Sequence, residues 1–291
     1  MSEAMEMDNQ TNNHDALGPQ TGIIGGTGFY SLFQSDVETW EVETPYGAPS
    51  SPVTVGSVQG VKVAFLSRHG DRHQYPPHVV NYQANIWALK RLGVNRIIAV
   101  GAVGALQKNF RIGEIVLCDQ FVNRTWGRKD TYYDGPVTTH ISVSDPYCAD
   151  IRKILLDAGS KLDIPLHAKA TLLIIQGPRF STKAENRDWR NAGYDLVSMT
   201  HYPEVALARE LGICYVSLCL VTDHATVLGD NEADPVSDLQ DVVGAFKTSH
   251  EKIIQLLDAA IPRLGEPPQC ACHRSLEGAR AESGWIPLWF K

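Results

Sequence analysis

No apolar run in this sequence is long enough to span a membrane, and no surplus of basic residues marks a surface for nucleic acid. The 26 Lys and Arg residues are outnumbered by 33 Asp and Glu residues, which gives a formal net charge of -7. Nucleic acids and anionic membranes bind clustered positive charge, so the composition argues against both as partners. The chain also lacks an internal repeat and a Gly/Ser-rich linker, and we therefore expect one domain.

The chain does have enough apolar material for a large core, with 43% hydrophobic residues among 291. We expect a disordered polar tail at 1–20, one folded domain at 21–264 and an atypical segment at 265–291. The tail has neither a basic region nor an apolar stretch, so we do not expect a signal peptide. Four of the six cysteines lie in core-like segments, which is typical of a cytoplasmic protein with reduced thiols.

Short β-branched runs alternate with amphipathic helical patterns, which predicts an α/β fold. The expected strands are 22–25, 61–66, 96–100, 115–121, 170–176, 196–199 and 214–221. The expected helices are 80–92, 149–162, 182–191, 203–211 and 237–260, the last with Ser237 and Asp238 as capping candidates.

Polar and aromatic residues follow the later strands in an order that suits a nucleoside. Segment 176–185 contains Phe180, which can stack on a flat base, and it is followed by Ser198, Glu204 and Asp223. Hydroxyls and carboxylates of this kind are suited to ribose and to the edge of a base. The sequence therefore predicts a pocket for a nucleoside.

Two upstream motifs are suited to an anion. The glycines of 25–28 allow backbone N–H groups to approach phosphate, although Ser31 replaces the third glycine of a dinucleotide-binding loop. In 67–70, Arg68 offers a forked donor and His69 an imidazole, both after an apolar run. The alternatives for these motifs are a plain turn and a solvated charge.

Together these motifs resemble the trimeric purine nucleoside phosphorylases, and within them the branch that acts on 5'-methylthioadenosine. The similarity runs in order from about residue 22 to 264 and includes 81–90 and 205–215. The resemblance implies a single-domain, mixed twisted sheet flanked by helices. It also implies a homotrimer that uses inorganic phosphate as a co-substrate, with no metal and no organic cofactor.

The resemblance assigns roles to individual residues. Phosphate would be held by Thr27, Arg68, His69, Ala102 and Thr200, near Gly101, where related chains often have Thr or Asn. Met199 and Glu204 would hold the ribose, and Phe180, Ser181 and Asp223 the base. Arg68, His69 and Asp223 would be catalytic, the last by stabilising the departing base at N7. His140 lies in the segment that reaches a neighbouring subunit's pocket in this family.

Two alternatives to 5'-methylthioadenosine phosphorolysis stay open. One is a phosphorylase for 6-oxopurine nucleosides or methylthioinosine, because Gly101, Ala225 and Asp238 depart from what the resemblance to the methylthioadenosine branch implies, and Ala225 departs from its 6-aminopurine pattern in particular. The other is a nucleotide-sensing or dinucleotide-binding protein without phosphorolysis. Phosphate-dependent release of a free base distinguishes the last from both enzymes.

The pair Cys270 and Cys272 is one residue too close for the usual zinc-binding spacing, and no second pair follows it in the sequence. We therefore predict free thiols here, with a redox-active pair as the alternative and no metal.

Overall fold

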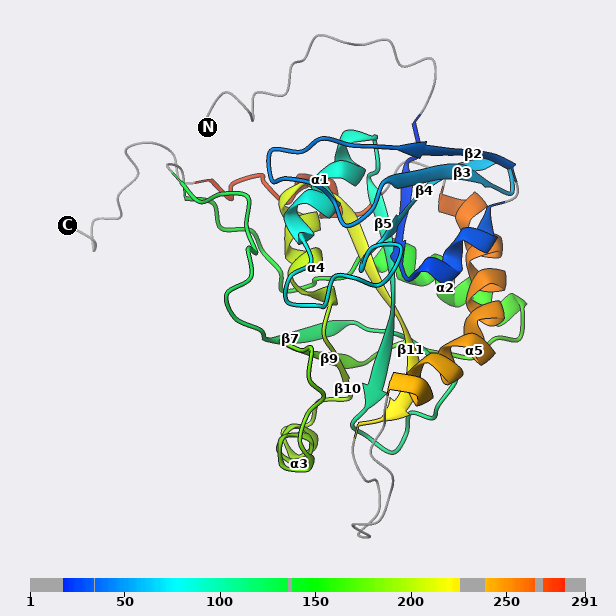
Figure 1. Ribbon diagram of the computed structural model, residues 1–291, viewed down its shortest axis with the longest axis vertical. Helices are drawn as coiled ribbons and strands as arrows, with labels where there is room; N and C mark the ends of the chain where they lie inside the picture. Colours follow the sequence, from blue (N-terminus) through cyan, green and yellow to red (C-terminus); the bar gives the residue numbers. More distant parts are fainter. Residues whose placement is uncertain (1–17, 34, 136–137, 226–238, 265–268, 281–291) are drawn as a thin grey trace, which may run out of the picture.

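The computed structural model describes residues 18–33, 35–135, 138–225, 239–264 and 269–280, and of Thr27, Tyr30, 239–243 and 245–248 only the backbone. A mixed sheet with helices on both faces forms the body of the described chain (Figure 1). This confirms the predicted fold class. The strands are β1 Thr21–Gly25, β2 Ser35–Trp40, β3 Val53–Val58, β4 Val61–Ser67, β5 Arg96–Ala105, β6 Ile115–Leu117, β7 Gln120–Arg124, β8 Leu166–His167, β9 Thr171–Ile175, β10 Leu196–Ser198 and β11 Cys214–His224.

The centre of the sheet is parallel. Strand β1 pairs with β4 on one side and β5 on the other, and β5 pairs with β11 along nearly its whole length. These strands are continuous apolar runs because helices cover both of their faces. Their carboxyl ends therefore meet at one edge of the sheet, where ligands of open α/β sheets bind.

Strand β5 also joins a second group of strands. Its last two residues pair antiparallel with β10, which continues through β9 to β7. Figure 1 shows β7, β9 and β10 running across the lower part of β5. This arrangement brings the end of β10 back along the carboxyl half of β5.

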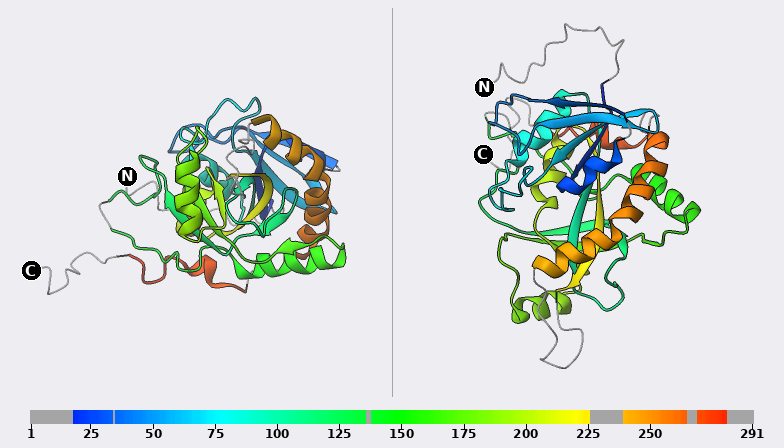
Figure 2. Two further views of the ribbon diagram at one scale, coloured as in Figure 1. Left: turned by 90° about the horizontal axis from the view of Figure 1, so that it is seen from below. Right: turned by 45° about the vertical axis from the view of Figure 1, so that its right-hand side comes forward.

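The two faces of the sheet have separate helices. Helices α1 Tyr82–Arg91 and α4 His201–Glu210 pack together and contribute to one apolar cluster, whereas α2 Ala149–Lys161 and α5 Leu239–Ala260 contribute to the other. Figure 2 shows these pairs on opposite sides of the strands. The remaining helices are α3 Lys183–Asn191 and the short 3-10 helices η1 Thr27–Leu32, η2 Ile261–Leu264 and η3 Ala271–Arg274. No described helix is long and apolar enough to cross a membrane.

Several local predictions were wrong. The expected strand 115–121 is two strands, β6 and β7, which pair with different neighbours. Strand β2 was not predicted, because every residue in it is exposed and it has no apolar face. The capping candidates Ser237 and Asp238 lie outside the described residues.

Candidate active site

Backbone register orders the predicted site residues along the edge of the sheet. Ser67 of β4 is level with Gly25 of β1, so Arg68 lies beside the first glycine loop. Along β5, Asp223 of β11 is level with Gly104, three residues beyond Gly101, and at about 3.3 Å per residue this separates them by roughly 10 Å. This length of β5 is sufficient for phosphate beside Gly101 and a purine beside Gly104.

Arg68 is buried and held in a forked ion pair with Glu204. Its Nε and Nη2 donate to the two carboxylate oxygens at 2.5 and 3.0 Å, and its Nη1 donates to the Val100 carbonyl at 2.9 Å. Burial alone lowers the pKa of Arg68, but the Glu204 carboxylate outweighs it and raises the pKa above its ordinary value. These bonds use three of the five guanidinium N–H groups, and the remaining two can still bind an anion.

The interpretation of Glu204 as a ribose ligand is at odds with this geometry. Its side chain is fully buried, and Tyr215 donates a further hydrogen bond to Oε2 at 2.8 Å. Both carboxylate oxygens are therefore occupied by groups of the core. Glu204 fixes the orientation of Arg68 instead, and sequence order alone could not show that the two side chains face each other.

His69 lies next to Arg68 in a compact loop. Its Nδ1 is 2.7 Å from the Tyr75 carbonyl, and its ring stacks on His73 at 4.4 Å between centroids. Burial, with the positive charge of Arg68, lowers the pKa of His69 to about 4. The ring is therefore neutral at pH 7, with Nδ1–H donating to the carbonyl and Nε2 left as an acceptor.

Gly101 has no side chain, and a histidine ring lies where one would extend. A Cβ at position 101 would lie 2.7 Å from Cε1 of His201, a fully buried residue that begins α4. Neither ring nitrogen of His201 has a hydrogen-bond partner among the described residues, and the Ala99 carbonyl favours the charged ring without reaching bonding geometry. Burial and then Arg68 lower the pKa of His201 to about 4. Sequence reasoning missed this residue, although it directly follows Thr200.

Thr200 and Met199 connect β10 to α4. Because β10 runs antiparallel to β5, these residues continue back towards the level of Gly101. Thr200 occupies the N-cap position of α4, but its hydroxyl makes no capping bond. Met199 packs against Gly177, whose φ is +61° and where a Cβ would lie 2.6 Å from Sδ. Thr200 is thus placed near Arg68, and Met199 further along the edge.

Asp223 occupies the other end. Its side chain is 7% exposed, and the Thr222 hydroxyl donates to Oδ1 at 2.9 Å. Oδ2 lies over β5, because a Cβ at Gly104 would be only 2.9 Å from it. The glycine therefore makes room for the carboxyl group, a constraint that the sequence did not reveal.

The loop that contains Phe180 and Ser181 borders the same end. Phe180 is 44% exposed, so the core position that is ordinary for a phenylalanine is excluded. Ser181 Oγ is 2.5 Å from Asn186 Oδ1, and Asn186 of α3 in turn bonds the Ala225 carbonyl just beyond β11. This chain of bonds ties the loop to the end of β11 near Asp223.

The three remaining predicted residues are Ala102, Thr27 and His140. Ala102 lies in β5 directly after Gly101, and its backbone N–H remains a predicted phosphate donor. Thr27 begins η1, and its side chain is outside the described part. His140 is exposed, and its backbone N–H donates to the Ala279 carbonyl of the C-terminal segment at 2.8 Å.

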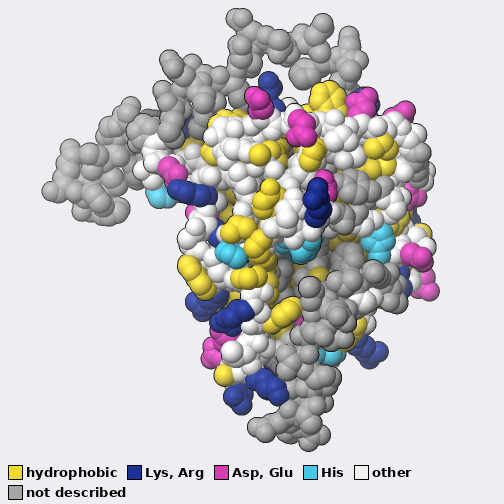
Figure 3. Space-filling view, viewed as in Figure 1, with side chains coloured by type: hydrophobic (Ala, Val, Ile, Leu, Met, Phe, Trp, Pro, Cys, Tyr) yellow, Lys and Arg dark blue, Asp and Glu magenta, His cyan; other side chains and the backbone are white. Residues whose placement is uncertain are grey.

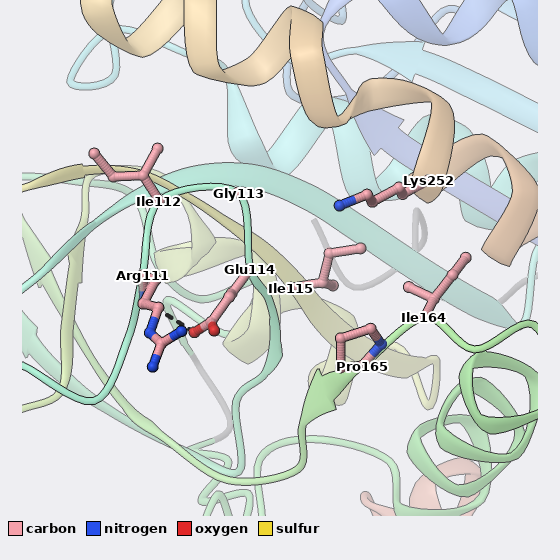
Figure 4. Close-up of a pocket in the computed structure, with 8 residues that line it drawn as sticks. All are labelled: Arg111, Ile112, Gly113, Glu114, Ile115, Ile164, Pro165 and Lys252. Carbon is pink, nitrogen blue, oxygen red and sulfur yellow. Dashed lines mark hydrogen bonds between the residues drawn. The ribbon is translucent and has the colours of Figure 1, made fainter.

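A separate hollow lies away from these residues. Figure 4 shows its lining, in which Arg111 and Glu114 contact each other and Lys252 projects from α5; the complete lining is Arg111, Ile112, Gly113, Glu114, Ile115, Ile164, Pro165 and Lys252. It has a volume of about 190 Å³ and includes none of the predicted site residues.

On the face viewed in Figure 1, hydrophobic and histidine side chains lie next to each other near the middle (Figure 3).

Comparison with known protein families identifies the family to which this chain is similar. The model of the phosphorylase superfamily matches residues 20–262. A curated S-methyl-5'-thioadenosine phosphorylase from Pyrococcus furiosus is 48% identical over 254 residues, which cover 87% of this chain and 96% of the relative. The enzyme of the same name from Nitrosopumilus maritimus is 40% identical over 89% of this chain and 97% of its own length.

Solved structures agree. A methylthioadenosine phosphorylase from an Antarctic soil metagenomic library superposes with a TM-score of 0.84 at 37% identity, covering 92% of this chain and 94% of the other. The methylthioadenosine phosphorylase of Schistosoma mansoni in complex with adenine gives a TM-score of 0.84 at 33% identity, covering 91% of this chain and 100% of the other.

Proposed function

This chain belongs to the phosphorylase superfamily, in the methylthioadenosine phosphorylase branch, and we propose on that premise that it catalyses phosphorolysis of 5'-methylthioadenosine. Inorganic phosphate attacks C1' of the ribose as the C1'–N9 bond breaks. The products are adenine and 5-methylthioribose 1-phosphate. The observation that carries the proposal is the order of residues along the sheet edge, from Arg68 and Gly101 to Asp223.

Phosphate binds at the Arg68 end. The groups assigned to it are the two guanidinium N–H groups that Glu204 and Val100 leave unused, the Thr200 hydroxyl and backbone N–H groups near Ala102, with Thr27 and His69. A nucleophile held under C1' reacts as an effectively intramolecular group, which removes much of the entropic barrier. Its negative charge also stabilises the oxocarbenium character that develops on the ribose.

The sugar and the base bind further along the edge. Met199, fixed against Gly177, packs on the ribose, and the exposed ring of Phe180 is available to cover the purine. Asp223, when protonated, donates to N7 and accepts from the 6-amino group, so that the electron pair of the breaking C1'–N9 bond can collect on the base. Ser181 lies beside it. The residues assigned here act without a metal or an organic cofactor.

The substrate class is tested by a panel of nucleosides. The purified protein should release base from methylthioadenosine with a higher kcat/KM than from adenosine, inosine or methylthioinosine. Preference for methylthioinosine or inosine would replace the proposal with the 6-oxopurine alternative, which Ala225 favours because it removes a second carboxylate near Asp223.

We further propose a cytoplasmic homotrimer in which His140 reaches a neighbouring pocket. His140 is exposed and held by Ala279 through its backbone, and Trp126 is 69% exposed, which suits a surface covered by another copy. Light scattering should give three times the chain mass, and His140→Ala should raise KM for methylthioadenosine without dissociating the assembly. A fully active monomer would contradict this.

A further inference from the structure

Two further cysteines, Cys148 and Cys214, lie beside the Cys270 and Cys272 pair in the folded chain, although the sequence did not indicate this. Cys148, Cys214, Cys270 and Cys272 have their sulfur atoms within 4.8 Å of one another, and Cys214 Sγ is 3.3 Å from Cys270 Sγ. Four thiolates at about 2.3 Å from a tetrahedral zinc ion lie about 3.8 Å apart. The observed separations bracket that value, so only small side-chain movements separate this cluster from a closed four-sulfur site.

The four cysteines come from three separate parts of the chain. Cys148 is the N-cap residue of α2 and makes no side-chain capping bond, Cys214 begins β11, and the other two belong to the C-terminal segment at η3. Cys148, Cys214 and Cys272 are each at most 5% exposed, and Cys270 is half-buried. Metal ligands on separate elements join those elements in the way that a disulfide does.

The surroundings are suited to a structural metal. The N-terminus of α2 favours negative charge, which offsets part of the net charge of a zinc ion with four thiolates. Backbone bonds fix two of the ligands, because Cys148 N–H donates to Tyr215 and Cys214 N–H donates to Asn95, both at 2.9 Å. Such outer hydrogen bonds hold ligands in place before the metal arrives.

We propose that Cys148, Cys214, Cys270 and Cys272 bind one Zn²⁺, which fastens the C-terminal segment 269–280 to the core. Soft thiolate ligands select zinc over magnesium or calcium, and four ligands leave no open position for catalysis. The site lies at the amino end of β11, opposite Asp223, and the proposal is independent of the nucleoside reaction. The fastened segment also contacts the His140 loop through Ala279 and Arg280.

The decisive measurement is the metal content of protein purified under reducing conditions. Elemental analysis should find one zinc per chain, retained through dialysis. Replacement of zinc by Co²⁺ should give the visible absorption of a tetrahedral, sulfur-ligated ion. Absence of metal, with mass spectrometry showing disulfides among the four cysteines, would overturn the proposal.

Variants locate the site. Cys270→Ala should lose the zinc, and because Cys270 is the most exposed ligand this change should disturb folding least. Cys118→Ala is the control, since Cys118 also lies close to another thiol, 3.6 Å from that of Cys219, but outside the cluster. It should keep the zinc. Equal zinc content in both variants would contradict the assignment, and limited proteolysis should cleave segment 269–280 faster only in Cys270→Ala.

Discussion

Replacement of Glu204 by Gln separates its proposed role, which is to position Arg68, from the role of a ribose ligand. The side chain keeps its shape but loses its charge. Arg68 is only 2% exposed, so its guanidinium would be left without a counterion in the core. Removing one partner of a buried ion pair costs about 3–5 kcal/mol of stability. Urea unfolding should show a loss of that order.

The kinetic effect should fall on phosphate. Without the carboxylate, the guanidinium loses the forked bonds at 2.5 and 3.0 Å that aim its free N–H groups. A hydrogen bond to a charged group contributes about 1.5–3 kcal/mol, which corresponds to a rise in KM for phosphate of roughly 10- to 100-fold. Initial rates measured over both substrates should show a much smaller change in KM for the nucleoside.

A double variant is the control for stability. Arg68→Met with Glu204→Leu removes both charges, and apolar replacement of a buried ion pair is often neutral or stabilising. It should regain most of the stability lost in Glu204→Gln while phosphate use stays defective. The reasoning is refuted if Glu204→Gln is as stable as the original and raises only the KM for the nucleoside.

Three other results are expected. Asp223→Asn should shift the ratio of kcat/KM towards inosine-type substrates by about 10-fold or more, since an amide can pair with a 6-oxo group and N7–H; an unchanged ratio would show that Asp223 does not read the base. The pKa values of His69 and His201, about 4 in the fold against about 6.5 unfolded, mean that the unfolded chain binds more protons between these values. The contribution of these two neutral rings to folding stability is therefore fully present above pH 6.5 and is lost as the pH falls towards 4. Thermal melts should give a lower Tm at pH 5 than at pH 7, and the difference in Tm should be smaller in His201→Gln. Finally, Gly101→Ala should displace the His201 ring, whose Cε1 would lie 2.7 Å from the new Cβ, and should raise the KM for phosphate several-fold. Unaltered phosphate kinetics would show that this ring does not contribute to phosphate binding.

The sequence was informative where local pattern determines structure. Continuous apolar runs predicted the central strands, and the Thr182–Glu185 capping box confirms the predicted start of α3. The exposed strand β2 could not be predicted, because its pairing with β3 depends on a neighbour rather than on its own apolar face.

In the candidate site too, features that depend on local sequence could be predicted and contacts between distant residues could not. Arg68 directly follows β4 and Asp223 is the last residue but one of β11, so their place near the carboxyl ends of these strands could be anticipated. Contacts between distant residues could not: Glu204 lies 136 positions from Arg68, and His201 fills the space beside Gly101. The four-cysteine cluster escaped prediction for the same reason, because its second pair is assembled from α2 and β11.

The central claim is that phosphate cleaves the nucleoside. Methylthioadenosine incubated with the protein and oxygen-labelled phosphate should yield adenine and an equal amount of methylthioribose 1-phosphate that retains the label, with no adenine when phosphate is omitted. Adenine released at the same rate without phosphate, or a sugar product without the label, would contradict the account.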